Sequence, residues 1–196
     1  MVALARPACP NPEALAKGNY KHPQNKDALR KSTSGKCMYC ESKIDHNSFA
    51  HVEHIKPKAK YPELEFVWDN LGYSCERCNN YKGDIYDEAL PFINPYDEEP
   101  EGHIIFIGAL AFCKQGSERG EFTIKALQLN RADLIEDRQE RLNAISAFIT
   151  AAFRSQNASL RTQALVEIKK EAEKDREYSR AVASLLVMQG IDEGGT

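Results

Sequence analysis

The chain of 196 residues is long enough for one domain, or for one domain with a helical extension. With 42% hydrophobic and 28% charged residues, its composition is that of a soluble globular protein with a sizeable core. Its longest apolar stretch, residues 104–113, is far shorter than the roughly 20 residues that cross a bilayer, and the chain does not open with a secretory leader. We therefore expect a cytoplasmic protein that enters no membrane.

Charge is distributed unevenly along the chain. Residues 1–82 hold 13 Lys and Arg against 9 Asp and Glu, whereas residues 83–196 hold 13 against 20. The basic first part can meet the phosphates of a nucleic acid. The acidic second part is better suited to a scaffold or to a surface that binds a protein partner.

The first 90 residues combine irregular and regular segments. Residues 1–23 contain four of the nine prolines and show little periodicity, so we expect an extended arm there, followed by a short basic helix over residues 24–36 that ends at Gly35. We expect a strand at residues 50–55 and a break at residues 56–62, where two prolines remove backbone donors. Residues 67–73 return towards the second cysteine pair, and a helix follows Cys75 to about Asp87.

The remainder is expected to be mostly helical. Residues 91–130 indicate a loop with short strands, and residues 104–112 are apolar enough for a strand or a short buried helix. From Arg131, apolar residues recur every three or four positions, which predicts a long helix. A second helix is expected over residues 159–189, with a break near Asp175.

Four of the six cysteines form two pairs with two residues between the thiols: Cys37, Cys40, Cys75 and Cys78. Two such turns complete a tetrahedral sulfur shell for Zn²⁺, which is the interpretation we favour. The alternatives are a disulfide framework, which suits short secreted chains, and a redox pair at one of the two sites. Cys9 and Cys113 are expected to be ordinary thiols.

The 34 residues between the two pairs exceed the 15–20 of a simple zinc ribbon and hold the residues best suited to catalysis. Glu53 and His54 are adjacent, so they would point to opposite faces of a regular strand. We expect the strand to bend or end at this point, before Lys56 and Pro57, if both side chains serve one site.

This pattern resembles the HNH endonuclease family, in which a β-hairpin and a helix surround one divalent metal ion. The match covers residues 37–84: Glu53 directly precedes His54, Asn70 begins an Asn-Leu step, and Asn79 directly follows the second cysteine pair. Many family members have histidine where this chain has Asn79, so the sequence is an HNN variant. The resemblance implies an α+β fold, with a zinc-bound ββα-metal module followed by a mostly α-helical C-terminal region.

The resemblance also implies how the site would work. His54 would act as general base on the attacking water, because a neutral imidazole is available near pH 7. Glu53 and Asn79 would offer oxygen ligands to Mg²⁺ or Mn²⁺, which would stabilise the developing charge and the leaving oxygen. Asn70 would hold the His54 ring through a backbone or side-chain hydrogen bond, as the central asparagine of the family fixes its loop. Phosphate contacts would come from Lys56, Lys58 and Lys82.

Every assignment has a simpler alternative. These are a surface or zinc-adjacent side chain for His54, a solvated carboxylate for Glu53, a turn for Asn70, a helix cap for Asn79 or Asn80, and a solvated face for the lysines. His51 shares a strand face with Glu53 and is a candidate extra ligand or a group that supports one.

A second resemblance lies outside the motif. Residues 92–101 and 123–131 are similar to the tail of HNH proteins from bacterial anti-phage systems, such as the nuclease subunits of Septu and of certain retron systems, which work beside an ATPase subunit. This second resemblance implies that the acidic helical half docks on that ATPase and that cleavage is restrained until infection.

The sequence therefore divides into an N-terminal arm with a short basic helix (1–36), the nuclease module (37–90), and a connecting segment with the helical C-terminal region (91–196). The leading hypothesis is a metal-dependent HNH endonuclease that cleaves DNA, with RNA as the other candidate substrate, in a defence complex. The alternative is a zinc-ribbon module that binds nucleic acid or a protein without catalysis, and which has no need of Glu53, His54 or Asn79.

Overall fold

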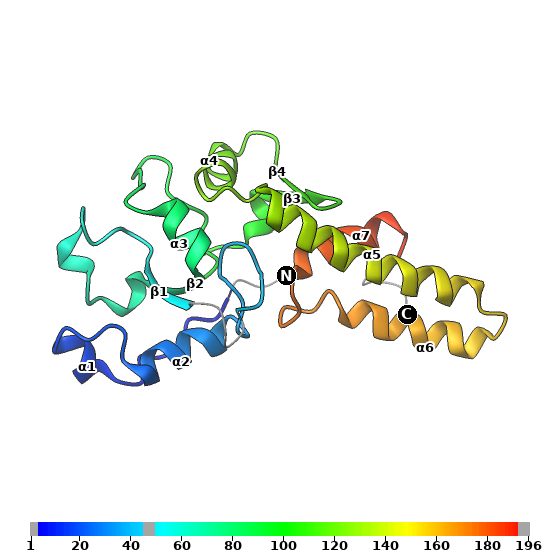
Figure 1. Cartoon of the computed structure of the whole chain (residues 1–196), viewed down its shortest axis with the longest axis horizontal. Coiled ribbons are helices and arrows are strands. Elements are labelled where there is room, and N and C mark those ends of the chain that lie inside the picture. The colour runs from blue at the N-terminus through cyan, green and yellow to red at the C-terminus, as the bar shows by residue number, and fades with distance from the viewer. Residues whose placement is uncertain (1–3, 45–49, 192–196) are drawn as a thin grey trace.

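A computed structural model describes residues 4–44 and 50–191 of the chain (Figure 1). In chain order, its helices are α1 (Pro12–Ala16), α2 (Pro23–Ser32), α3 (Glu76–Lys82), α4 (Glu118–Ala126), α5 (Ala132–Arg154), α6 (Ala158–Lys170) and α7 (Ser179–Met188). Its strands are β1 (Ala50–His54), β2 (Leu71–Cys75), β3 (Ile104–Ile107) and β4 (Leu110–Cys113). Short 3₁₀ turns lie at Pro62–Leu64, Trp68–Asn70 and Pro100–Gly102. This is the expected α+β architecture.

The first hairpin and helix α3 form the ββα module. Strands β1 and β2 pair antiparallel with Val52 opposite Tyr73, and both of these side chains are buried. Helix α3 starts directly after β2, where the Cys75 sulfur accepts a hydrogen bond from the Cys78 amide. The helix ends at Lys82 and is followed by Gly83, whose φ of +47° favours glycine, so it is shorter than the expected helix to about Asp87.

Two short helices were not expected. Helix α1 lies within the supposed extended arm, where Asn11 caps its first turn and Pro12 occupies the first helical position. Helix α4 lies within the supposed loop-and-strand segment, where the Ser117 hydroxyl accepts a hydrogen bond from the Gly120 amide. Local capping, rather than a long apolar stripe, begins both helices.

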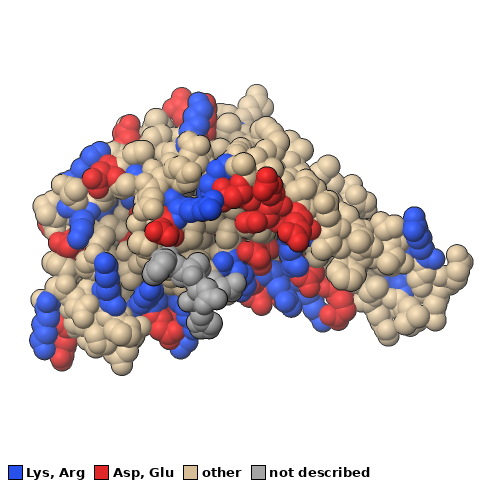
Figure 2. All heavy atoms as spheres, viewed as in Figure 1, with Lys and Arg blue, Asp and Glu red and all other residues tan. Residues whose placement is uncertain are grey.

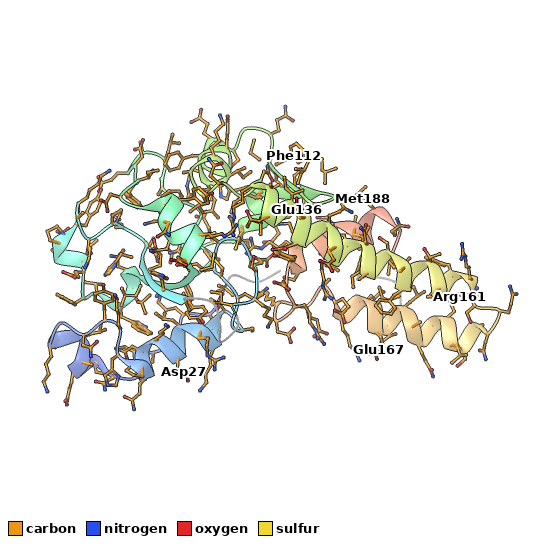
Figure 3. The ribbon with its side chains drawn as sticks, in the orientation of Figure 1. Asp27, Phe112, Glu136, Arg161, Glu167 and Met188 are labelled. Atoms are coloured by element: carbon orange, nitrogen blue, oxygen red, sulfur yellow. The ribbon has the colours of Figure 1, made fainter. Side chains whose placement is uncertain are left out.

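The C-terminal region agrees with the expected pattern. Helix α5 is the long helix predicted from Arg131, and the second predicted helix is broken into α6 and α7 around Asp175. Helices α5 and α6 form an antiparallel hairpin that projects from the rest of the molecule (Figure 1). Side chains such as Arg161 and Glu167 stand out from this hairpin (Figure 3). Within the described residues, no helix combines the length and the apolar character that a bilayer span requires.

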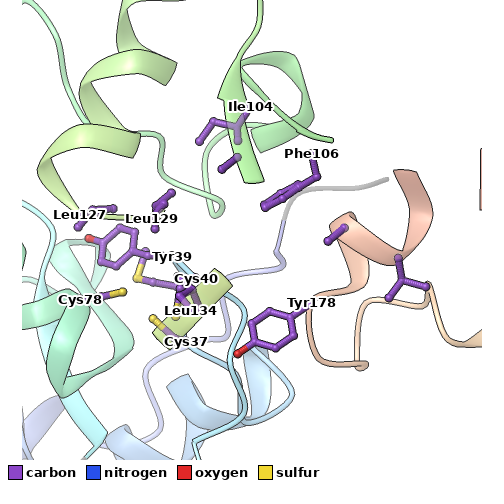
Figure 4. Close-up of a cluster of buried hydrophobic side chains, with 14 of the residues drawn as sticks. Cys37, Tyr39, Cys40, Cys78, Ile104, Phe106, Leu127, Leu129, Leu134 and Tyr178 are labelled. Atoms are coloured by element: carbon purple, nitrogen blue, oxygen red, sulfur yellow. The ribbon is translucent and has the colours of Figure 1, made fainter. Parts of the chain in front are cut away.

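The core is continuous between the module and the helical region. Cys37, Cys40 and Cys78 are buried among apolar side chains that include Leu127 and Leu134 (Figure 4). Helix α7 begins at this core, where the Tyr178 hydroxyl lies 3.0 Å from that of Ser42. The residues that carry the thiols are therefore enclosed by segments distant in the sequence.

Both charge signs occur on the face seen in Figure 2. Lys and Arg side chains lie among Asp and Glu side chains at the end formed by α1 and α2, and a group of Asp and Glu side chains lies towards the middle of the view. The excess of positive charge in residues 1–82 is therefore not gathered into one patch on this face.

Candidate active site

The four paired cysteines come together as one cluster. Their sulfur atoms all lie within 4.8 Å of one another, and three of the four residues are buried. All six cysteines are free, and the Cys40 and Cys75 sulfurs are 3.9 Å apart, which is too far for a disulfide bond. Four converging thiols from two knuckles fit a tetrahedral Zn²⁺ ion.

An arginine from the helical region lies against this cluster. The Arg131 guanidinium donates a hydrogen bond to the Cys78 sulfur at 3.7 Å and also pairs with Asp133. Four thiolates around one Zn²⁺ carry a net negative charge, which a guanidinium stabilises. The residues around the cluster therefore fit a bound zinc ion in charge as well as in geometry.

The predicted catalytic residues surround a separate cavity of about 260 Å³. Strand β1 ends at His54, two residues before Lys56, and Glu53 and His54 both line this cavity although they are adjacent in sequence. Asn79 of α3 lines it as well, together with His51, whose Nδ1 lies 3.4 Å from the Asn79 amide nitrogen. The expected end of the strand is thus present at the position where the site needs it.

The His54 ring is held through one of its nitrogens. Its Nε2 lies 3.0 Å from the carbonyl oxygen of Glu65. Because a carbonyl oxygen only accepts, Nε2 carries the hydrogen and Nδ1 keeps the lone pair that can take up a proton. Burial lowers the pKa of His54, which favours the neutral ring.

Asn70 supports the loop that holds His54, and it does not contact the ring itself. Its side-chain oxygen accepts from the Lys56 amide at 2.7 Å, and its amide nitrogen donates to the carbonyls of Lys56 and Leu64 at 3.0 and 3.1 Å. Asn70 thus fixes the loop, as the central asparagine of the family would, but the hydrogen bond of the His54 ring is made to the Glu65 carbonyl and not to Asn70.

Lys82 occupies a different environment from the expected one. Its side chain is only 1% exposed, and its ammonium pairs with the Glu53 carboxylate at 2.6 Å and donates to the His54 carbonyl at 2.8 Å. Burial raises the pKa of Glu53 to about 7, although Lys82 opposes this rise. The expected contact between Lys82 and a phosphate is thus corrected. The buried ammonium is engaged by two residues of β1, and its role is to position Glu53.

The other two lysines remain near the surface. The Lys58 ammonium pairs with Glu65 at 2.9 Å, and that of Lys56 lies 5.2 Å from the centre of the Tyr61 ring. Sequence reasoning did not identify Tyr20 and Lys21, which also line the cavity. They precede α2 in a segment without periodicity, and no local pattern in the sequence marks them.

Comparisons with known proteins agree with this geometry. Residues 37–84 match the family model described as HNH endonuclease. The chain is 34% identical to the Septu protein PtuB of Bacillus thuringiensis over 95% of its own length and 82% of that protein. It is also 34% identical to the Septu protein PtuB of Bacillus mycoides (strain KBAB4), over 61% of this chain and 51% of that protein. The chain therefore belongs to the HNH endonuclease family, a family of phosphodiester hydrolases, and resembles Septu protein PtuB along most of its length.

Proposed function

We propose that the chain is a metal-dependent endonuclease and the effector subunit of a bacterial anti-phage defence complex. The observation that carries the proposal is a single cavity lined by Glu53, His54 and Asn79, beside a cysteine cluster that shapes the backbone around it. A module that only binds nucleic acid has no use for this combination.

His54 is the proposed general base. Its Nε2–H is engaged by the Glu65 carbonyl, so Nδ1 takes the proton from the attacking water. Burial keeps the ring neutral at physiological pH because it lowers the pKa of His54. Asn70 and Lys82 act as positioning residues, the first through the loop that carries Glu65 and the second through Glu53.

Glu53 and Asn79 would hold a divalent cation, with His51 as a candidate additional ligand. A carboxylate and an amide oxygen suit a hard ion such as Mg²⁺ or Mn²⁺. The Asn79 amide nitrogen faces His51, which leaves its oxygen as the donor atom for an ion. Within residues 4–44 and 50–191, only the cysteines form a close cluster of three or more His, Cys, Asp or Glu ligands, so this site would be completed by substrate and water. Such an ion would stabilise the charge on the phosphate and the leaving oxygen.

Nucleic acid is the proposed substrate, with DNA as the first candidate and RNA as the second. The half-buried Lys56 and the exposed Lys58 belong to the loop that flanks the cavity, and their ammonium groups would contact phosphates. The net positive charge of residues 1–82 supports this assignment.

The helical region is the proposed docking surface for an ATPase subunit of the same defence system. The α5–α6 hairpin exposes Phe148 and Leu160 beside a groove of about 500 Å³, and the region is acidic. Exposed apolar groups in a groove are typical of a protein interface. The similarity to Septu protein PtuB over 95% of this chain supports a partner of the Septu type.

The test is incubation of the purified protein with plasmid DNA and with RNA, alone and with the ATPase. Each reaction is run with Mg²⁺, with Mn²⁺ and without either ion, while zinc content is measured separately. The proposal predicts cleavage that requires the added ion and that H54A abolishes, with zinc and nucleic-acid binding retained. H22A is the matched control, because His22 only caps α2. Unchanged cleavage by H54A would exclude His54 as base, and binding without any cleavage would favour the non-catalytic alternative.

A further inference from the structure

Two aromatic rings form a shelf beside the candidate catalytic histidine. Tyr20 and Phe66, which we call the aromatic shelf, have ring centres 6.2 Å apart. The Tyr20 ring also meets the His54 ring edge to face, with centres 4.6 Å apart. Phe66 is 40% exposed, although it lies next to the cavity that Tyr20 lines. An exposed aromatic surface thus extends outward from His54.

Two exposed lysines accompany the shelf. The ammonium groups of Lys21 and Lys58 lie 5.5 and 5.3 Å from the centre of the Tyr20 ring. Both lysines line the cavity, and neither is buried. Long exposed side chains can move their ammonium groups to a nearby phosphate when another group covers the ring. The shelf therefore combines a stacking surface with cations that can bind the backbone of the same nucleotide.

We propose that the aromatic shelf binds an unstacked nucleobase next to the phosphate that is cleaved. The inference rests on the proposed nuclease function and specifies its substrate: nucleic acid that is single-stranded or locally unpaired. A base can stack on Tyr20 or Phe66 only after it leaves a duplex, because within a duplex both of its faces are covered by neighbouring bases. Tyr20 touches His54, so the base held on the shelf belongs to a nucleotide at the reacting phosphate.

A purely structural purpose explains only part of this arrangement. Packing against His54 accounts for Tyr20, which is half-buried and in contact with the core. It does not account for Phe66, whose ring stays 40% exposed with its centre 6.2 Å from that of Tyr20. A structural purpose accounts for Lys58, which pairs with Glu65, but not for the position of Lys21 beside the Tyr20 ring. Stacking with phosphate contact uses all of these groups together.

The test compares one oligonucleotide sequence as a single strand, as a perfect duplex and as a duplex with one unpaired base. F66A removes the exposed ring, and Y20L keeps apolar volume against His54 but removes the aromatic face. Y81A is the control, because Tyr81 is 45% exposed on α3 and does not line the cavity. The readouts are kcat and KM for each substrate, and the fluorescence of a 2-aminopurine base, which falls when the base stacks.

The wild type is expected to cleave the single strand and the unpaired site at least tenfold more efficiently than the duplex. F66A and Y20L should each raise KM for these two substrates about tenfold and weaken the 2-aminopurine quenching, while Y81A changes neither. Equal or better cleavage of the duplex by the wild type would overturn the inference, as would variants that keep the quenching. If no substrate is cleaved, the proposed function fails, and the quenching by the wild type and by F66A still decides whether the shelf binds a base.

Discussion

Asn70 offers the sharpest test of how the active-site loop is held. Its buried side chain makes three hydrogen bonds, all to the backbone of the loop that begins at Lys56 and whose Glu65 carbonyl holds the His54 ring. The substitution N70A removes all three and leaves one amide and two carbonyls without these partners. The loop should therefore loosen before the rest of the module unfolds.

The expected loss of stability in N70A follows from the number of hydrogen bonds that it removes. Each hydrogen bond contributes roughly 0.5–1.5 kcal/mol net, so N70A should lower the free energy of unfolding by about 2–4 kcal/mol. For a chain of this length the melting temperature should fall by on the order of 10 °C. N70A should also slow cleavage by the folded protein, because a displaced Glu65 carbonyl no longer orients His54. We expect kcat to fall about 10- to 100-fold.

The substitution N70D makes the same reasoning depend on pH. One carboxyl oxygen can still accept from the Lys56 amide, but the other would face the carbonyls of Lys56 and Leu64, to which Asn70 now donates. Facing oxygens repel a carboxylate, so the pKa of the new carboxyl should lie above its ordinary value. A carboxyl whose pKa is higher in the folded than in the unfolded protein stabilises the folded state at acid pH, where it is protonated. This stabilisation is lost as pH rises through the raised pKa. N70D should therefore be closest in stability to the wild type near pH 4 and fall behind as pH increases.

Urea unfolding followed by tryptophan fluorescence would measure these changes. Trp68 is the only tryptophan of the chain and lies two residues before Asn70, so it reports on the loop directly. N94A is the matched control, because Asn94 is also buried and bonds to Tyr96 and Asp97. It should lower stability without lowering kcat. The reasoning is refuted if N70A unfolds within about 0.5 kcal/mol of the wild type, or if its kcat equals that of N94A.

Three further predictions follow from the site. K82M should lower the free energy of unfolding in urea by about 3–5 kcal/mol, because it leaves the Glu53 carboxylate buried without its partner. A K82M/E53Q protein that is no more stable than K82M would contradict this reasoning. R131Q should speed zinc release to a colorimetric chelator, whereas R77Q, which alters an exposed guanidinium, should not. Because burial lowers the pKa of His54 from 6.5, the ring stays neutral at lower pH, and kcat should decline only below pH 6.5; a decline that begins above pH 7 would disagree.

The parts of the site that the sequence predicts are those made by local contacts. Two knuckles, a hairpin of five-residue strands and one helix turn are enough to bring Glu53, His54 and Asn79 to one cavity. The spacing of these residues in the sequence is therefore enough to predict that they meet at one site. The cysteine cluster is predictable for the same reason, because two residues between thiols fix a turn whatever surrounds it.

The parts that the sequence does not predict depend on contacts between distant segments. Lys82 is charged and follows a polar stretch, so nothing local indicates that its ammonium is buried against Glu53. Tyr20 belongs to a segment without periodicity, and only the fold places it on His54. Helix α1 has five residues, which is too short for an apolar repeat to register. For Lys82 and Tyr20, tertiary packing outweighs the local pattern, whereas helix α1 depends on a local cap rather than on an apolar stripe.

The last of these long-range contacts concerns how the helical region joins the module. Glu41 follows Cys40 and is buried, and its carboxylate accepts from the Ser179 hydroxyl at 3.0 Å and from the Arg180 amide at 3.2 Å. The Lys36 ammonium lies 3.3 Å from the same carboxylate. Burial alone would raise the pKa of Glu41, but Arg180 and Lys36 outweigh burial and lower it. A buried ion cluster of this kind is stable only while all of its partners are in place.

A chain that ends at residue 170 should therefore lose more than helix α7. Glu41 and Lys36 would keep each other, but the carboxylate would lose both Ser179 and Arg180, and the knuckle beside Cys40 should loosen. We expect faster hydrogen exchange at residues 36–43 and faster zinc release than in the whole chain. S179A removes one hydrogen bond from the cluster and should show a smaller change in the same direction. A shortened chain that keeps its zinc and its exchange protection would mean that the module folds independently of the C-terminal helices.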